Sequence, residues 1–190
     1  MTKKLKPMVL TALLAAIATA LYFLEFPLFP AASHLKLDFS DIPALLGALA
    51  FGPFAGAAIE LIKNLIELLV KGAGSQMGFG NLMNFLVGCA FVLPFSALLH
   101  RRGTQSEAPK GPRLALACAA GLTVLIAVGL VMNYTITPLF FRHFLQIEIT
   151  REAVAAVVGF ATALNAIKGA VLCAFGCVFA RSAQVKRLLR

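Results

Sequence analysis

Charged residues are scarce in this sequence. Asp, Glu, Lys and Arg make up 13% of the 190 residues, and Trp is absent. A soluble domain has about 25% charged and about 45–50% apolar residues, whereas 60% of this chain is hydrophobic. A core of this size cannot bury that excess, so lipid is its natural solvent. The composition therefore predicts a membrane protein rather than a soluble domain.

The sequence also lacks the motifs of several enzyme classes. It has no GxxxxGK[ST] phosphate loop, no HExxH and no GxSxG. The four cysteines form no CxxC pair, and no His lies near them at metal-binding spacing, so we expect them to be packing residues. We therefore expect a protein that is not an enzyme, with no catalytic residues, no metal site and no cofactor.

Long apolar stretches, separated by polar or Gly- and Pro-rich segments, predict an all-α protein with six transmembrane helices in one domain, 1–190. The apolar stretch after the first lysines is too long for a signal-peptide core and is expected to be a retained span. The short second helix is expected to pair with the third. The segment from Asn133 to Arg151 is expected to break at Pro138. The helices are expected at about 7–24, 42–51, 53–70, 81–99, 114–132 and 152–180.

Basic residues account for the formal net charge of +9. They form no continuous basic face with interleaved aromatics, so we expect no nucleic-acid partner. They cluster at both ends of the chain and in one central segment, which the positive-inside rule places in the cytoplasm together with both termini of a multi-pass cell-membrane protein. Eleven basic residues then lie inside and four lie in the outer loops: Lys3, Lys4, Lys6, Arg101, Arg102, Lys110, Arg113, Arg181, Lys186, Arg187 and Arg190, against Lys36, Lys71, Arg142 and Arg151.

Polar residues inside the spans are informative, because a charge in lipid costs about 2.5–3.5 kcal/mol on insertion scales. In the third helix Glu60, Lys63, Asn64, Glu67 and Lys71 share one stripe at spacings of three, four and seven. The alternating signs predict the pairs Lys63–Glu67 and Glu67–Lys71. The stripe either holds helices together or forms one wall of a polar cavity.

The last predicted helix carries Asn165 and Lys168 on one face, with no acid on that helix within one turn of Lys168. Asn133 ends the fifth helix, and Asn81 and Asn84 begin the fourth. A single Asn in a membrane helix is usually interhelical glue. The convergence of three elements in the outer half instead predicts a pocket for a small polar molecule that enters from outside.

The first helix repeats Ala at every fourth position, at Ala12, Ala16 and Ala20. Small residues at this spacing form a smooth stripe that another helix can approach closely. The stripe could serve internal packing or an external partner.

Several segments together resemble one family. The stretch LKLDFSDIPALLG at 35–47 is similar to the first loop and second helix of the substrate-binding S components of energy-coupling factor (ECF) vitamin transporters, above all the riboflavin-specific ones. The stretches 52–64 and 81–88 resemble their third and fourth helices. Asn133-Tyr134 and Asn165-Ala-Ile-Lys168 resemble their fifth and sixth. The likeness covers nearly the whole chain, with the motifs in order.

The resemblance implies a six-helix fold with a riboflavin pocket near the outer face, capped by the first loop. It implies that Asn133, Asn165 and Lys168 contact the flavin. It also implies a transmembrane coupling subunit, which meets the alanine stripe, and two cytoplasmic ATPases, with delivery by toppling of the loaded bundle. The full set of expected ligand contacts is Asn133, Asn165, Lys168, Asp38, Phe39, Leu37, Asn84 and Asn64.

Three alternatives stay open. An S component for thiamine, biotin or pantothenate would share the fold, and a carboxylate ligand would use Lys168 as its counter-ion. A membrane enzyme would have to rely on Glu60 or Glu67, since no His lies within the spans. A non-transport membrane protein would use the polar residues only as glue.

Overall fold

The computed structural model describes residues 5–32, 35–72, 78–99, 111–144 and 150–182, together with 109, 146 and 148. Its helices are α1 (Leu5–Phe23), α2 (Asp41–Phe51), α3 (Pro53–Lys71), α4 (Phe79–Leu99), α5 (Gly111–Val131), α6 (Thr137–Phe144) and α7 (Arg151–Arg181). A 3-10 turn, η1 (Pro30–Ala32), and an antiparallel pair of two-residue strands, β1 (Phe26–Pro27) and β2 (Lys36–Leu37), lie between α1 and α2. Two histidines and most of the basic residues used to predict orientation lie outside the described residues: His34, His100, Lys3, Lys4, Arg101, Arg102, Lys110, Lys186, Arg187 and Arg190.

The break expected at Pro138 does not occur. The helix that begins at Gly111 continues to Phe144 through a π-helical turn, Met132–Ile136. The Thr137 backbone N–H donates to the Met132 carbonyl, five residues back, so hydrogen bonding is already rearranged where Pro138 follows. A proline in the first turn of a helical segment is tolerated, because its missing N–H is not needed there.

In the part of the chain that the structure describes, four helical stretches are long and apolar enough to cross a membrane: α1, α4, the continuous α5–α6 helix and α7. The eleven-residue α2 is apolar but too short to cross alone. The nineteen-residue α3 has the length but carries the charged stripe.

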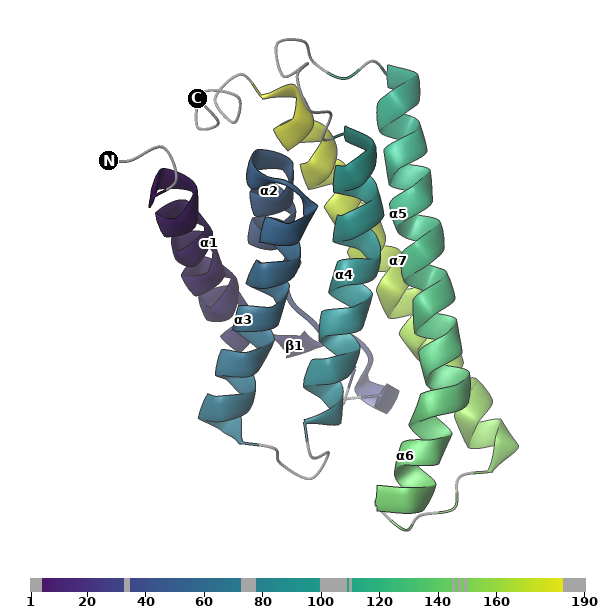
Figure 1. Ribbon diagram of the computed structural model, residues 1–190. Coiled ribbons are helices and arrows are strands. Elements are labelled where there is room, and N and C mark those ends of the chain that lie inside the picture. Colours follow the sequence, from purple (N-terminus) through teal and green to yellow (C-terminus); the bar gives the residue numbers. More distant parts are fainter. Residues whose placement is uncertain are drawn as a thin grey trace.

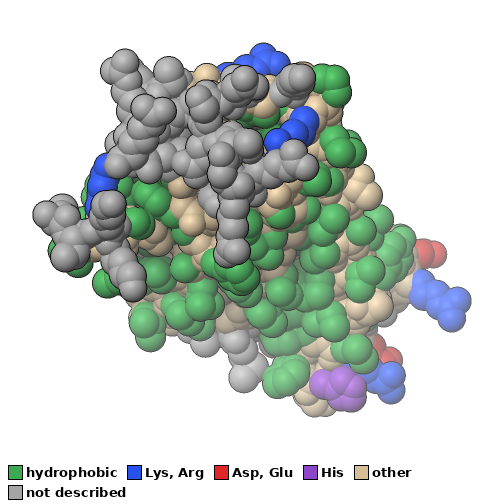
Figure 2. Space-filling model, turned by 45° about the horizontal axis from the view of Figure 1, so that its top comes forward, with side chains coloured by type: hydrophobic (Ala, Val, Ile, Leu, Met, Phe, Trp, Pro, Cys, Tyr) green, Lys and Arg blue, Asp and Glu red, His purple; other side chains and the backbone are tan. Residues whose placement is uncertain are grey.

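The faces of α3 are reversed relative to a helix of a soluble protein. Its buried side includes Glu60, Lys63 and Glu67, whereas apolar residues such as Phe54 (90% exposed) and Leu69 (82% exposed) point outward. In water such a helix would bury its charges and expose its hydrophobic surface, the opposite of what solvation favours. The arrangement is favourable when the outer face meets lipid. Figure 2 shows the same hydrophobic covering over much of the molecule's flank.

The helices form one bundle around an apolar core in which Phe91 and Phe95 of α4 stack with ring centroids 5.4 Å apart. In this bundle α3 packs against α1, α2 and α4, while α5 packs against α4 and α7. Gly56 permits a close approach of α3 to α2 and α4, because a Cβ there would lie 2.5 Å from the Ala48 Cβ and 2.7 Å from Val92. The core fills the middle of the bundle and leaves the polar residues toward one end.

The two ends of the bundle differ. The start of α1, the end of α4, the start of α5 and the end of α7 lie together at the top of Figure 1, and the strands, α6 and the start of α7 lie toward the other end. Lys6, Arg113 and Arg181, the described members of the basic clusters, are therefore at the top end. The polar site described next is nearer the other end.

Candidate functional site

The site begins where the loop after β2 enters α2. Ser40 is the N-cap residue of α2, but its side chain makes no cap hydrogen bond. Instead, its backbone N–H donates to Asp38 Oδ1 at 2.8 Å, and its hydroxyl also donates to that oxygen. The loop thereby folds Asp38 back toward the start of the helix, where Asp41 is fully buried.

Lys63 of α3 is 0% exposed and joins this loop to α3. Its ammonium donates to Ser40 Oγ at 2.7 Å and to Asp41 Oδ1, and it forms an ion pair with Glu60 Oε2 at 2.8 Å. The predicted pairing with Glu67 is wrong, because the acids of α2 and of the preceding turn of α3 surround Lys63 instead. A buried ammonium is stable only with such partners.

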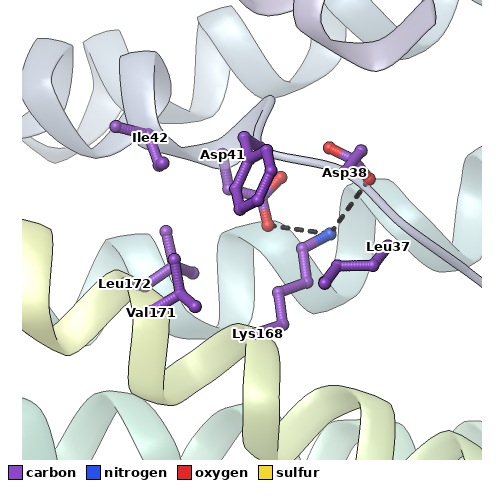
Figure 3. A pocket seen from close by; sticks show the side chains of 8 residues that line it. Leu37, Asp38, Asp41, Ile42, Lys168, Val171 and Leu172 are labelled. Atoms are coloured by element: carbon purple, nitrogen blue, oxygen red, sulfur yellow. Dashed lines mark ion pairs between the residues drawn. The ribbon is translucent and has the colours of Figure 1, made fainter. Parts of the chain in front are cut away.

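Lys168 of α7 also pairs with Asp41, and in addition with Asp38 (Figure 3). Its Nζ lies 2.9 Å from Asp41 Oδ2 and 3.6 Å from Asp38 Oδ2, and it donates a hydrogen bond of 2.8 Å to Asn84 Oδ1. Asp41 therefore lies between two buried lysines from different helices. The negative charges that balance Lys168 therefore come from the loop and from α2 rather than from its own helix.

Two amides extend this network into α3 and α4. Asn84 Nδ2 donates to Asn64 Oδ1 at 3.4 Å, and Asn64 Nδ2 donates to the Glu60 carbonyl at 2.8 Å. The predicted contact residues Asp38, Asn64, Asn84 and Lys168 thus form one connected cluster.

Asn133 and Asn165 meet at a second place, around Gly129 of α5. Asn133 Nδ2 donates to the Gly129 carbonyl at 2.8 Å, and a Cβ at Gly129 would overlap Asn165 Nδ2. Among the described residues, Asn165 has no side-chain hydrogen-bond partner, although it is only 8% exposed. Its amide therefore keeps its hydrogen-bonding capacity one turn away from Lys168.

A hollow of about 210 Å³, including its opening, lies between the loop, α2 and α7. Lys168 and two acids supply its polar wall, and the remaining side chains are apolar (Figure 3). Phe39 is 40% exposed and lies at its edge, whereas Leu37 is buried. The lining residues are Leu37, Asp38, Phe39, Asp41, Ile42, Lys168, Val171 and Leu172.

A second set of ion pairs holds the strands against the helix ends. Glu25 Oε1, just after α1, accepts from Lys36 Nζ of β2 at 2.6 Å and from Lys71 Nζ of α3 at 2.7 Å. Lys71 also pairs with Glu67 at 2.9 Å, which confirms that predicted pair. Burial acts to raise the pKa of Glu25, but the hydrogen bonds from Lys36 and Lys71 outweigh it and hold that pKa below its ordinary value.

The alanine stripe lies on the surface. Ala12, Ala16 and Ala20 are all exposed, while Ala15 and Ala18 on the other face of α1 are buried. The stripe is therefore not used for packing within the described part of the chain, and a partner helix could approach it closely.

Sequence reasoning missed Asp41 and Ser40 as site residues, because Ser and Asp at the start of a helix are more often capping residues than ligand contacts. The sequence signal that could have found these two residues is the presence of Lys63 and Lys168 within predicted helices. Two buried lysines require acids nearby, and the short segment 38–41 carries two that no helix stripe uses. Among the described residues, no three His, Cys, Asp or Glu side chains form a group that could hold a metal ion.

The fold and site together define a helical membrane protein with a buried cluster of paired charges near one end of the bundle. The family model for the substrate-specific component of ECF transporters matches residues 6–178. The chain belongs to this family, whose members bind the substrate of a transporter rather than catalyse a reaction.

Relatives and a solved structure agree with this assignment. The riboflavin transporter FmnP of Bacillus subtilis (strain 168) is 32% identical over 172 residues, which cover 89% of this chain and 87% of that protein. The riboflavin transporter RibU of Staphylococcus aureus (strain TCH60) is 33% identical over 169 residues, covering 88% and 84%. The solved S component of a bacterial ECF transporter superposes with a TM-score of 0.71 at 26% identity, covering 93% of this chain and 94% of that one.

Proposed function

We propose that this chain is the high-affinity riboflavin-binding subunit of an ATP-driven ECF importer in the cell membrane. In this proposal 1–190 form one domain, the six transmembrane helices are α1, α2 (paired with α3), α3, α4, the continuous α5–α6 helix and α7, and both termini are cytoplasmic. The chain captures riboflavin from outside and delivers it with a transmembrane coupling subunit and two cytoplasmic ATPases. The observation that carries the ligand assignment is the hollow beside Lys168, whose ammonium also donates a hydrogen bond to the Asn84 amide oxygen.

Riboflavin matches this chemistry. It has a flat, mostly uncharged ring system, an imide-like edge and a hydroxylated chain. The free amide of Asn165 offers both a donor and an acceptor to the imide edge, and Lys168 can donate to a carbonyl or hydroxyl. Leu37 and Phe39 supply apolar surface for the rings. Asn133, Asn64, Asn84 and Asp38 complete the proposed contacts.

The charge count favours an uncharged vitamin over biotin or pantothenate. The cluster around Lys168 holds three carboxyl groups, on Asp38, Asp41 and Glu60, and two ammonium groups, on Lys63 and Lys168. It has no spare positive charge for a carboxylate ligand. A carbonyl or hydroxyl can accept from Lys168 without adding negative charge to a buried site.

The hollow must enlarge to accept a flavin. Sites for small molecules typically have volumes of about 300–1,000 Å³, whereas the cavity volume of this hollow is only about 10 Å³ once the space open to solvent is left out. The loop that carries Leu37 and Phe39 is the part able to move, because α2 and α7 are held together by Asp41 and Lys168. We therefore expect Phe39 to shift when riboflavin binds.

A binding titration tests the proposal. Purified in detergent, the protein should bind riboflavin tightly, and flavin absorbance should accompany it from cells. Asn165→Ala and Lys168→Met should each weaken binding by about 10-fold or more, because each leaves ligand polar groups unpaired. Ser96→Ala is the matched control, since its buried hydroxyl bonds only to carbonyls of its own helix.

The outcomes separate the alternatives. Unchanged affinity in both variants would refute the site assignment. Mass spectrometry of the bound small molecule that identified thiamine, biotin or pantothenate would refute riboflavin while retaining the S-component role. Absence of any bound or binding vitamin would favour a non-transport membrane protein.

A further inference from the structure

Lys168 has hydrogen-bonding capacity to spare. Its ammonium carries three N–H donors, and Asn84 Oδ1 accepts one of them at 2.8 Å. Asp41 Oδ2, 2.9 Å from Nζ, takes a second donor in a buried ion pair. The contact of Lys168 with Asp38 Oδ2 is longer, at 3.6 Å, beyond hydrogen-bond distance. A ligand acceptor can therefore take a donor of Lys168 without breaking a hydrogen bond.

Asp38 is the partner of Lys168 that can give way. Asp41 is fully buried and is held by Lys63 through its other oxygen, and Asn84 is fixed on α4 by Asn64. Asp38 lies on the loop between β2 and α2, and among the described residues its hydrogen bonds come from Ser40 alone, through Oδ1, while its pair with Lys168 is long. Its Oδ2 faces Lys168 across the wall of the hollow (Figure 3). The incoming acceptor must therefore approach Lys168 next to the Asp38 carboxylate.

We propose that Asp38 is a specificity-determining residue, whose carboxylate beside Lys168 admits uncharged acceptors and rejects anionic ones. This inference rests on the proposed binding of flavins. An uncharged carbonyl accepts from Lys168 and adds no charge. A carboxylate in the same place repels Asp38, and like charges 5–8 Å apart in a partly buried site change an equilibrium by about 10-fold or more.

Two flavins of the same shape test the inference. One carries a carbamoylmethyl group at N10 and the other a carboxymethyl group, so they differ by one negative charge. The wild-type protein should prefer the uncharged flavin. In Asp38→Asn that preference should fall by about 10-fold or more, because the repelling charge is gone. Asp38→Ser, which removes the same charge with a smaller side chain, should give the same result.

Glu152→Gln is the matched control, because it removes one acid from the exposed start of α7. Glu152 lies sixteen residues before Lys168, about 24 Å along the helix, farther than the screening length of about 8–10 Å. The Glu152→Gln variant should prefer the uncharged flavin as strongly as the wild type does. Each variant is also titrated with riboflavin.

Each result decides the matter. If both Asp38 variants bind riboflavin but keep the wild-type preference, the inference is overturned and the proposed function stands. If both lose riboflavin binding, Asp38 is required for folding or for direct contact, and its role in specificity is overturned. If the wild-type protein binds no flavin at all, the proposed function itself fails.

Discussion

Replacing Lys63 by Met removes the only ammonium that contacts both Asp41 and Glu60 in the described structure. All three side chains are essentially inaccessible to solvent. Met has nearly the length of Lys, so packing is largely retained while two buried carboxyl groups lose a partner. Breaking a buried ion pair by removing one member costs about 3–5 kcal/mol. We expect Lys63→Met to destabilise the protein by this amount.

Lys71→Met provides the control on the same helix. Lys71 also contacts two acids, Glu25 and Glu67, but its side chain is 37% exposed. Pairs that water can reach are worth about 0–1 kcal/mol. The two substitutions are chemically identical, so the difference between them isolates the effect of burial.

The assay follows from the composition. With no Trp in the chain, unfolding is better followed with a thiol-reactive fluorogenic dye. The free cysteines, which are buried or half-buried, become reactive as the bundle opens: Cys89, Cys118, Cys173 and Cys177. At about 2–4 °C per kcal/mol for a chain of this length, Lys63→Met should lower Tm by about 6–20 °C.

A second substitution separates charge from packing. Adding Glu60→Gln to Lys63→Met removes one of the two stranded carboxylates and should restore part of the lost stability. If Lys63→Met and Lys71→Met lower Tm equally, or if the double variant recovers no stability, the buried charges do not determine stability as argued.

Three further outcomes are expected. Gly129→Ala should displace the Asn165 amide and weaken riboflavin binding by about 10-fold, with little loss of stability, whereas Gly159→Ala, which faces open space, should change neither. Glu25→Gln should release the loop and so speed riboflavin association and dissociation in stopped-flow measurements. Because the pKa of Glu25 is lowered, the wild type should keep slow exchange above the ordinary pKa of Glu. It should lose slow exchange only as the pH falls through the lowered pKa. Ala16→Leu should abolish co-purification with the coupling subunit and leave riboflavin affinity unchanged.

The helices could be predicted closely because their signal is local. Apolar runs and punctuating Gly and Pro residues set the bounds, and the spacing of Glu60, Lys63, Asn64 and Glu67 correctly predicts a buried stripe. The predicted break at Pro138 is wrong, because the helix accommodates this proline through the π-helical turn before it. The hydrophobic periodicity of the sequence does not reveal such a turn. The partners of Lys63 also could not be predicted, because they come from another helix that spacing along α3 cannot identify.

The charged residues of this chain explain why the site is rigid in one part and adjustable in another. No water within hydrocarbon can replace a lost partner, so Asp41 must stay between Lys63 and Lys168 whether or not a ligand is bound. That requirement fixes α2, α3 and α7 relative to one another. The loop with Asp38 and Phe39 is not fixed in this way, because among the described residues Ser40 alone holds Asp38 by hydrogen bonds. The proposed binding of riboflavin can therefore move the loop at little cost while α2, α3 and α7 keep their positions relative to one another.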